Sequence, residues 1–256
     1  MNMSGVMAIT MAGMGSRFKK AGYHQPKYEI EVLGHPLFDW SMLSLTAFRD
    51  AGWRFCFATS KDMQAKPYIA ARCKALGIII DDVIELDHVT DGQATTALLL
   101  AQKAPSDASF AVYNIDTFVR PGLMAPPDPA LCDGWIPCFR APGDGWSFVR
   151  LDDDQKVVEV REKVRISDFA TLGLYWFRNA QMYCDLYHQH FARPDGMEKG
   201  ERYIAPMYNR LIEARQRVTI SDIPVRDVGM LGTPDQVKAF REAPTEAVNE
   251  TLKLMP

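Results

Sequence analysis

The chain has 256 residues, of which 47% are hydrophobic and 24% are charged, and its net charge is -3. This composition is typical of a globular protein, and the slight acidity argues against a protein that coats nucleic acid or a membrane surface. Five scattered cysteines with no CxxC pair favour a reducing, cytoplasmic setting. We expect no export signal and no membrane span, because no apolar run is long enough.

The first half of the chain alternates between strand-like and helix-like patterns. Apolar runs bounded by turn residues indicate the strands, and apolar residues at near-helical spacing indicate the helices. Such alternation predicts a largely parallel sheet with helices on both faces. The predicted strands are 6–11, 28–33, 53–59, 83–89 and 109–115, and the predicted helices are 37–48, 62–76 and one entered through Gly92.

The second half is richer in strands. Residues 146–163 have the pattern of a hairpin around Asp152–Gln155, and its literal D-x-D sequence is interpreted as a solvated turn rather than a metal motif. We infer one domain with an inserted half that faces a substrate. Further strands are predicted at 134–139, 169–177 and 218–223, and further helices at 179–191, 204–215 and 234–242.

A glycine-rich loop with two later cations follows the first predicted strand. In an open α/β sheet, ligands bind outside the carboxyl ends of the strands, and a bare loop there presents backbone N–H groups to an anion. Arg17 can bind phosphate oxygens through its forked guanidinium, and Lys27 acts as a point charge. The alternative is a tight turn with solvated cations. A Rossmann fingerprint would need a third glycine where Phe18 stands, and no Walker motif is present.

The stretches "MAGMGSRF" and "QPKYEIEVLGHPLFDW" resemble the leading motif of the sugar-nucleotidyltransferase family. Lys20 and Gly22 depart from it, since the family often has proline and threonine there. Later segments resemble the family in the same order, so that the resemblance covers about residues 5–240: "DGQATTALLLA", "VYNID", "REK", "GLYWF", "ERYIAPMYNRLI" and "GTPDQVKAF". The matching positions of the leading motif are Gly13, Gly15, Ser16, Arg17, Pro26, Lys27, Gly34 and Pro36.

The resemblance implies a Rossmann-like, GT-A-like three-layer α/β fold with a mostly parallel central sheet and an inserted β-rich half. It implies one nucleotidyltransferase domain over residues 1–256. The nucleotide-binding half is predicted at about 1–118, the acceptor-binding half at about 119–233 and a C-terminal helix at about 234–256.

The resemblance also implies a set of site residues. Mg²⁺ would be held by Asp116 at the end of a strand and by Asp227, although alignment on "GTP" instead places Met230 at the second metal position. Asp87, near the expected base contact, would favour bases that present N–H groups. The implied catalytic residues are Arg17, Lys27 and Asp116; the nucleotide-binding residues are Ala12, Gly13, Met14, Gly15, Ser16, Asp87 and Gly92; and the acceptor-binding residues are Asn114, Glu162, Lys163, Gly173 and Tyr203, with Asn209 as a further candidate.

The implied reaction is attack of a phosphomonoester, usually a sugar 1-phosphate, on the α-phosphorus of an NTP, with release of pyrophosphate. The implied partners are therefore an NTP and a small phosphorylated acceptor, with a homo-oligomer left open. One alternative is a cytidylyltransferase acting on a phosphocholine-like alcohol, for which the aromatic residues of "GWS" and "LYWF" could cage a quaternary ammonium. The others are a regulator that binds nucleotide sugars without catalysis and a GT-A-like glycosyltransferase.

Overall fold

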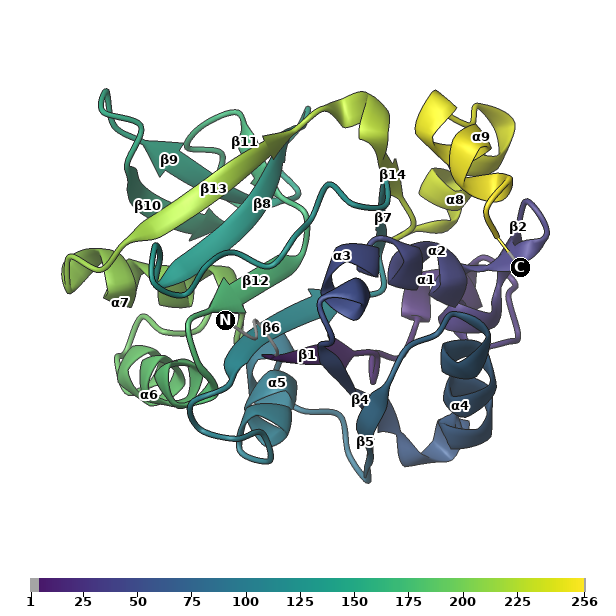
Figure 1. Ribbon diagram of the computed structural model, residues 1–256, viewed down its shortest axis with the longest axis horizontal. Helices are drawn as coiled ribbons and strands as arrows, with labels where there is room; N and C mark the ends of the chain where they lie inside the picture. The colour runs from purple at the N-terminus through teal and green to yellow at the C-terminus, as the bar shows by residue number, and fades with distance from the viewer. Residues whose placement is uncertain (1–4, 256) are drawn as a thin grey trace.

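A computed structural model describes residues 5–255, and its centre is a sheet of ten strands (Figure 1). The sheet order is β10-β9-β11-β8-β12-β6-β1-β4-β5, with β13 paired to β8. Two small two-stranded sheets, β14-β7 and β2-β3, lie outside it. The strands are β1 (Gly5–Thr10), β2 (Glu31–Val32), β3 (His35–Pro36), β4 (Arg54–Ser60), β5 (Ile80–Leu86), β6 (Ser109–Asn114), β7 (Thr117–Val119), β8 (Gly134–Arg140), β9 (Ser147–Leu151), β10 (Val157–Glu162), β11 (Phe169–Thr171), β12 (Leu174–Phe177), β13 (Val218–Ile223) and β14 (Val228–Met230).

The helices account for most of the other regular structure, and Pro67 lies in the first turn of its helix, where a missing N–H costs nothing. The α-helices are α1 (Ser16–Lys20), α2 (Leu37–Leu43), α3 (Thr46–Asp50), α4 (Lys66–Ala75), α5 (Gln93–Ala101), α6 (Ala180–Phe191), α7 (Tyr208–Glu213), α8 (Pro234–Glu242) and α9 (Glu246–Leu252). The short 3₁₀ helices are η1 (Lys27–Glu29), η2 (Lys61–Met63), η3 (Ala205–Met207) and η4 (Val225–Asp227).

Two buried clusters cover opposite faces of the sheet. Side chains alternate along a strand, so Met7 and Ile9 of β1 face one cluster while Val6 and Ala8 face the other. The first cluster contains side chains from α2, α3 and α4, and the second contains side chains from α5, α6 and α7. The predicted three-layer α/β fold is therefore confirmed.

The strand directions divide the sheet into two regions. β5, β4, β1 and β6 pair in parallel and belong to the predicted nucleotide-binding half. β12 then pairs antiparallel with β6, and β8, β11, β9 and β10 continue the sheet in antiparallel fashion, with β13 parallel to β8. The strands of the β-rich half therefore continue the same sheet from the edge strand of the parallel region, β6. The predicted hairpin is confirmed as β9 and β10, and Asp152 Oδ1 accepts hydrogen bonds from backbone N–H groups in its turn.

The C-terminal region differs from the predicted single helix at 234–256. Two helices, α8 and α9, are present instead, and each begins with a threonine side chain that accepts a hydrogen bond from the first turn. Phe240 and Val248 from these helices pack in a third buried cluster with Phe18 and Trp40. Residues 1–4 and 256 of the predicted domain lie outside the described residues.

No helix between residues 5 and 255 has both the length and the apolar character needed to cross a bilayer. All five cysteines are free; four are buried, and Cys184 is half-buried.

Candidate active site

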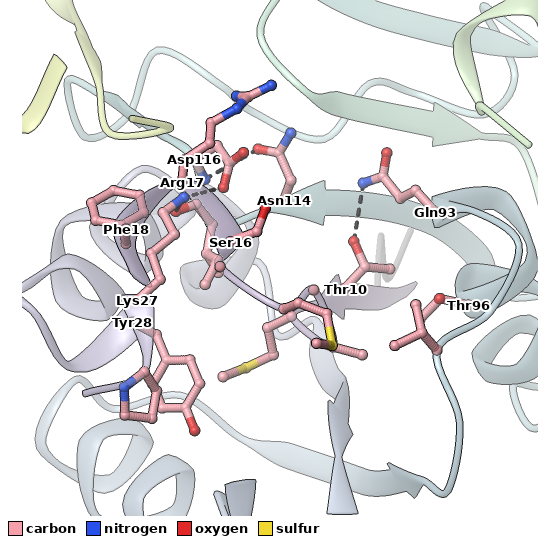
Figure 2. A pocket seen from close by; sticks show the side chains of 18 of the residues that line it. Thr10, Ser16, Arg17, Phe18, Lys27, Tyr28, Gln93, Thr96, Asn114 and Asp116 are labelled. Atoms are coloured by element: carbon pink, nitrogen blue, oxygen red, sulfur yellow. Dashed lines mark hydrogen bonds and ion pairs between the residues drawn. The ribbon is translucent and has the colours of Figure 1, made fainter. Parts of the chain in front are cut away.

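A cavity of about 780 Å³ opens at the carboxyl ends of β1 and β6. Its walls come from segments far apart in the chain: the loop after β1, the segment around Lys27, residues 89–93 and Thr96, residues 114–116 at the end of β6, residues 200–201, and Gly232. Figure 2 shows Arg17, Lys27, Asn114 and Asp116 together on one side of the loop that begins at Thr10, with Gln93 and Thr96 on the other side. The cavity therefore has a charged region and a separate uncharged polar region.

The glycine-rich loop forms the wall between these regions. Met11 N–H donates to the Ala58 carbonyl at 2.9 Å, and the next backbone bond of the loop runs from Phe18 N–H to the Gly15 carbonyl at 3.0 Å. Within the described residues, the N–H groups of residues 12–16 have no backbone acceptor. Gly15 has a φ of +59°, a left-handed conformation that favours glycine, and it is the N-cap residue that precedes α1. The predicted loop residues, Ala12, Gly13, Met14, Gly15 and Ser16, all line the cavity.

The two predicted cations occupy different positions in the cavity. Lys27 begins η1 after Pro26, and its side chain is only 13% exposed. Its Nζ donates to the Ile115 carbonyl at 3.2 Å and to the carboxylate of Asp116. Arg17 lies on α1 with its side chain exposed, and Figure 2 shows its guanidinium extending beyond the Lys27–Asp116 pair. A fixed cation thus lies beside a carboxylate, with a second cation at the rim.

Asp116 and Asn114 are held by the backbone around them. Asn114 Oδ1 accepts a hydrogen bond from Asp116 N–H at 3.3 Å. Gly173 has a φ of +78°, and a Cβ there would lie 2.4 Å from the Asn114 amide nitrogen. Gly173 therefore leaves room for the Asn114 side chain, and its predicted contact with the acceptor stays a prediction.

The prediction that Asp227 completes a metal site with Asp116 is wrong. β14 and β7 pair with Met230 opposite Thr117, and Leu231 N–H donates to the Asp116 carbonyl at 2.7 Å. Asp227 lies beyond the far end of this ladder, buried, with its Oδ1 2.7 Å from Arg120 Nε. Gly232 is the residue of this segment that lines the cavity. Among residues 5–255, no group of three or more His, Cys, Asp or Glu residues is arranged to hold a metal ion.

The uncharged region contains residues that the sequence reasoning missed. Gln93 Nε2 donates to Thr10 Oγ1 at 3.0 Å, and both residues line the cavity. Thr96 also lines the cavity and shares a hydrogen bond of 2.6 Å with Thr90. The sequence offered one signal for Gln93, its position directly after the predicted base-loop glycine. Exposed Met14 and Val89 add apolar surface at the rim.

Gly92 lines the cavity as predicted, but Asp87 does not. A Cβ on Gly92 would lie 2.3 Å from the Arg202 carbonyl oxygen, so the chain itself occupies the space beside this glycine. Asp87 is exposed and forms an ion pair of 2.9 Å with Lys61. Asp87 is not part of the cavity wall, so the structure does not bring it together with the other predicted nucleotide-binding residues, and its contact with the base stays a prediction.

Three predicted acceptor residues form a cluster beside the cavity. Lys163 Nζ donates to Tyr203 Oη at 2.6 Å and lies 3.7 Å from Glu162 Oε1. Burial raises the pKa of Glu162, and the hydroxyl of Ser147, which donates to it, partly opposes this shift. Glu201, close to Tyr203 in the chain, lines the cavity, whereas the three clustered residues do not.

Two other acceptor-side predictions are corrected. Asn209 bonds the backbone of β10 through both atoms of its amide, accepting from Val160 N–H at 2.9 Å and donating to Val160 O at 2.8 Å. The aromatic residues of "LYWF" are at most 5% exposed and belong to the core, so they cannot form a cage for a quaternary ammonium.

No family model and no curated protein matches the chain. Solved structures with the same fold do match it. A crystal structure of the nucleoside-diphosphate-sugar pyrophosphorylase from Vibrio cholerae RC9 is 36% identical, with a TM-score of 0.85, and the match covers 92% of this chain and 99% of that one.

Two more distant structures share the fold. The inositol-1-phosphate CTP transferase from T. maritima is 14% identical, with a TM-score of 0.68 and coverage of 94% of this chain and 97% of that one. A protein from Bacillus anthracis, described as a glucose-1-phosphate thymidylyltransferase in complex with a sucrose, is 15% identical, with a TM-score of 0.72 and coverage of 95% and 96%. Because the Vibrio cholerae protein is 36% identical over nearly the full length of both chains, the chain belongs to the nucleoside-diphosphate-sugar pyrophosphorylase family of sugar nucleotidyltransferases.

Proposed function

We propose that the chain joins an NTP to a phosphomonoester, with a sugar 1-phosphate as the preferred acceptor, and releases pyrophosphate. One observation carries the proposal: a single cavity brings the bare glycine loop, Arg17, Lys27 and Asp116 together at the carboxyl edge of the sheet. Open α/β sheets bind ligands at this edge, and loop N–H groups beside cations suit a polyphosphate. The family of the chain supports the same chemistry.

The proposed reaction needs no catalytic base. A phosphomonoester has a second pKa near ~6 and is already largely a dianion at neutral pH. The obstacle is the repulsion between this dianion and the triphosphate, which positive charge and alignment reduce. In the proposal, Arg17 binds the leaving phosphates and Lys27 offsets charge at the reacting phosphorus. The acceptor oxygen then forms its bond to the α-phosphorus as the bond to the leaving pyrophosphate breaks.

The residues at the site fit a magnesium ion that is bound largely by the nucleotide. Mg²⁺ is usually held by one or two carboxylates together with substrate phosphates and water. Asp116 offers one carboxylate that is 49% exposed, and the Asn114 amide oxygen lies beside its backbone. When bound there, the ion would supply charge neutralisation at the phosphates. Asp116 would hold it, since Asp227 is buried beyond the far end of the β14–β7 ladder.

The proposed acceptor is a sugar 1-phosphate because polar groups cluster beside the cavity. Glu162 can accept hydrogen bonds from sugar hydroxyls, and Lys163 can attract the phosphate. The solved relatives are described as acting on nucleoside-diphosphate sugars, glucose 1-phosphate and inositol 1-phosphate. We propose that this chain acts on a phosphorylated polyol of the same class.

We place the proposed reaction in the cytoplasm. Five free cysteines, four of them buried, suit a compartment that keeps thiols reduced. Burial raises the pKa of Cys56 and that of Cys73 to about 12, so these thiols resist ionisation.

Pyrophosphate release tests the proposal. The protein is incubated with Mg²⁺, each of CTP, UTP, dTTP, ATP and GTP, and a panel of sugar 1-phosphates and phosphoalcohols. We expect release with one pair and loss of release in Asp116→Ala. Binding of nucleotide without turnover across the panel would favour the regulator. A product that forms only from a preformed nucleotide sugar would favour the glycosyltransferase.

A further inference from the structure

One short segment contacts both the nucleotide side and the acceptor side of the site. We call residues Gly200–Tyr203 the bridging segment. Gly200 and Glu201 line the cavity, and Tyr203 Oη accepts a hydrogen bond of 2.6 Å from Lys163. Lys163 Nζ also lies over the Tyr203 ring, 4.5 Å from its centroid. The segment thus connects the cavity wall with the proposed acceptor residues within a few positions of chain.

The backbone of Arg202 is fastened to the loop that precedes α5. Arg202 N–H donates to the Asp91 carbonyl at 2.8 Å, and Ala94 N–H donates to the Arg202 carbonyl at 3.1 Å. Gly92 lies between these two bonds. Glycine leaves room for them, because a Cβ added at this position would lie 2.3 Å from the Arg202 carbonyl oxygen. Two backbone hydrogen bonds therefore connect the bridging segment to this loop.

The side chain of Arg202 completes a closed ring of polar contacts with Asp91, Thr95 and Tyr187. Its Nε forms an ion pair of 3.1 Å with Asp91 Oδ2, and its Nη1 donates to the hydroxyl of Tyr187 on α6. The Tyr187 hydroxyl lies 2.8 Å from Thr95 Oγ1, which in turn donates to Asp91. The guanidinium also lies over the rings of Tyr187 and Phe191, at 5.5 and 5.2 Å from their centroids.

The ring joins four parts of the chain: the loop before α5, helix α5 itself through Thr95, helix α6 and the bridging segment. Arg202 is 29% exposed, so the network is partly shielded from solvent and its ion pair is screened less than a surface pair. None of its members other than Asp91 lines the cavity. Arg202 therefore touches neither proposed substrate and acts through its neighbours.

We propose that Arg202 is a positioning residue that couples nucleotide binding to acceptor binding. The proposal rests on the proposed function. A nucleotide that settles against Gly92 and Gln93 orders the loop before α5, and Arg202 transmits this order to Tyr203 and hence to Lys163. Because coupling between two sites is reciprocal, the acceptor raises nucleotide affinity by the same factor.

Hydrogen exchange tests the coupling without knowledge of the acceptor. The protein is mixed with Mg²⁺ and each of the five NTPs, and exchange is followed in three regions: 10–17, 90–95 and 160–165. The last region contains Lys163 N–H, which donates to the Trp146 carbonyl at 2.9 Å. We expect an NTP that protects the first two regions to slow exchange in 160–165 about fivefold or more, at the lower end of usual coupling strengths. In Arg202→Gln, protection of 10–17 persists and protection of 160–165 is lost.

Three further variants separate positioning from a structural role. Tyr187→Phe removes one hydroxyl of the ring and keeps the aromatic contact, so it should weaken the coupling while folding as the wild type does. Arg202→Lys keeps the positive charge and should restore part of the coupling. Arg193→Gln breaks another arginine ion pair near the end of α6, with Glu213 at 3.1 Å, and should leave the coupling unchanged. If Arg202→Gln does not fold, Tyr187→Phe decides the question.

The outcomes distinguish this inference from the proposed function. If no NTP protects residues 10–17 of the wild type, both fail. If an NTP protects 10–17 and 90–95 but never 160–165, the coupling is absent and the proposed function stands. Equal protection of 160–165 in the wild type, Arg202→Gln and Tyr187→Phe likewise overturns the role of Arg202 alone.

Discussion

Lys27 and Asp116 form an ion pair across 89 positions of the chain, and Lys27 Nζ also donates to the Ile115 carbonyl at 3.2 Å. The lysine side chain is 13% exposed and the aspartate 49% exposed. The cation is therefore held in place by two acceptors, while the carboxylate keeps a free face toward the cavity. A group fixed before substrate arrives needs little reorganisation during the reaction.

Replacement of Lys27 by methionine should impair catalysis much more than folding. Loss of one preorganised charge-stabilising group typically lowers kcat by roughly 10²–10³-fold. We expect this loss in the rate of pyrophosphate release, with thermal stability little changed because the partner carboxylate can be solvated. Lys20→Met, on the exposed surface of α1, is the control and should behave as the wild type does. A loss smaller than about tenfold would mean that Lys27 does not act on the reacting phosphates.

Asp116→Asn should lower activity with little effect on stability, whereas Asp227→Asn should lower stability and keep the magnesium response. Asp116→Asn should abolish Mg²⁺-dependent pyrophosphate release without a large loss of stability, because the side chain is half-exposed. Asp227→Asn should keep the Mg²⁺ dependence and lower the free energy of unfolding by about 1–2 kcal/mol, since it weakens a partly buried pair with Arg120. Urea unfolding and a magnesium titration of activity measure the two effects. Loss of magnesium response in Asp227→Asn would contradict the site described above.

Gly92→Ala should damage the site, and Gly13→Ala should leave the fold intact. At Gly92, φ is +149° and a Cβ would lie 2.3 Å from the Arg202 carbonyl oxygen, so the loop or the bridging segment must shift. At Gly13, no atom of residues 5–255 beyond its chain neighbours lies within 4 Å of the position that a Cβ would take, so the fold has room for a methyl group. We expect a lower melting temperature and weaker NTP binding for Gly92→Ala, and an unchanged melting temperature for Gly13→Ala. Equal melting temperatures would refute the proposed packing.

Glu162 and Glu159, both on β10, should contribute to stability with opposite pH dependence. Burial raises the pKa of Glu162 above its ordinary value of 4.5, so the folded protein binds this proton more tightly than the unfolded chain. Its contribution to the free energy of unfolding is present below pH 4.5 and falls as pH rises through the raised pKa. Glu162→Gln should remove this decline.

Glu159 provides the matched control. Hydrogen bonds from Arg161 and Arg150 lower the pKa of Glu159 below 4.5, so its contribution is present above pH 4.5 and is lost as pH falls through the lowered pKa. The free energy of unfolding is measured from acidic to neutral pH. Relative to the wild type, its slope against pH should change with one sign in Glu162→Gln and with the other sign in Glu159→Gln. If the slope changed with the same sign in both variants, the conclusion that burial raises the pKa of Glu162 would be wrong.

The local sequence was sufficient for most elements and for the charged region of the site. It was not sufficient at residues 28–33, where the 3₁₀ helix η1 and the two-residue strand β2 replace the predicted strand. The alternation of apolar runs gave the parallel region, because strand and helix periodicities are local signals. Lys27 and Asp116 were placed in one site by the resemblance of their motifs to the sugar-nucleotidyltransferase family, and the structure pairs their side chains.

The second metal position could not be chosen from the sequence, because "DVG" and "GTP" offered two alignments. The register of β14 against β7 places Met230 opposite Thr117, and this register depends on distant pairing rather than on local pattern. The resemblance implied that Gly92 contacts the nucleotide and Gly173 the acceptor, and in the structure another group lies close to each glycine. In both cases the approaching group belongs to the protein, the Arg202 backbone and the Asn114 side chain, which no local pattern indicates.

Strand β12 has a consequence for how substrates enter and leave. Trp176 pairs with Ala111 of β6 on one side and with Trp135 of β8 on the other, so one uninterrupted backbone ladder spans the nucleotide and acceptor halves. Rotation of the two halves as rigid bodies about a hinge would break this ladder. We therefore expect any opening and closing to be confined to the loops along the carboxyl rim, with the sheet beneath them keeping its geometry.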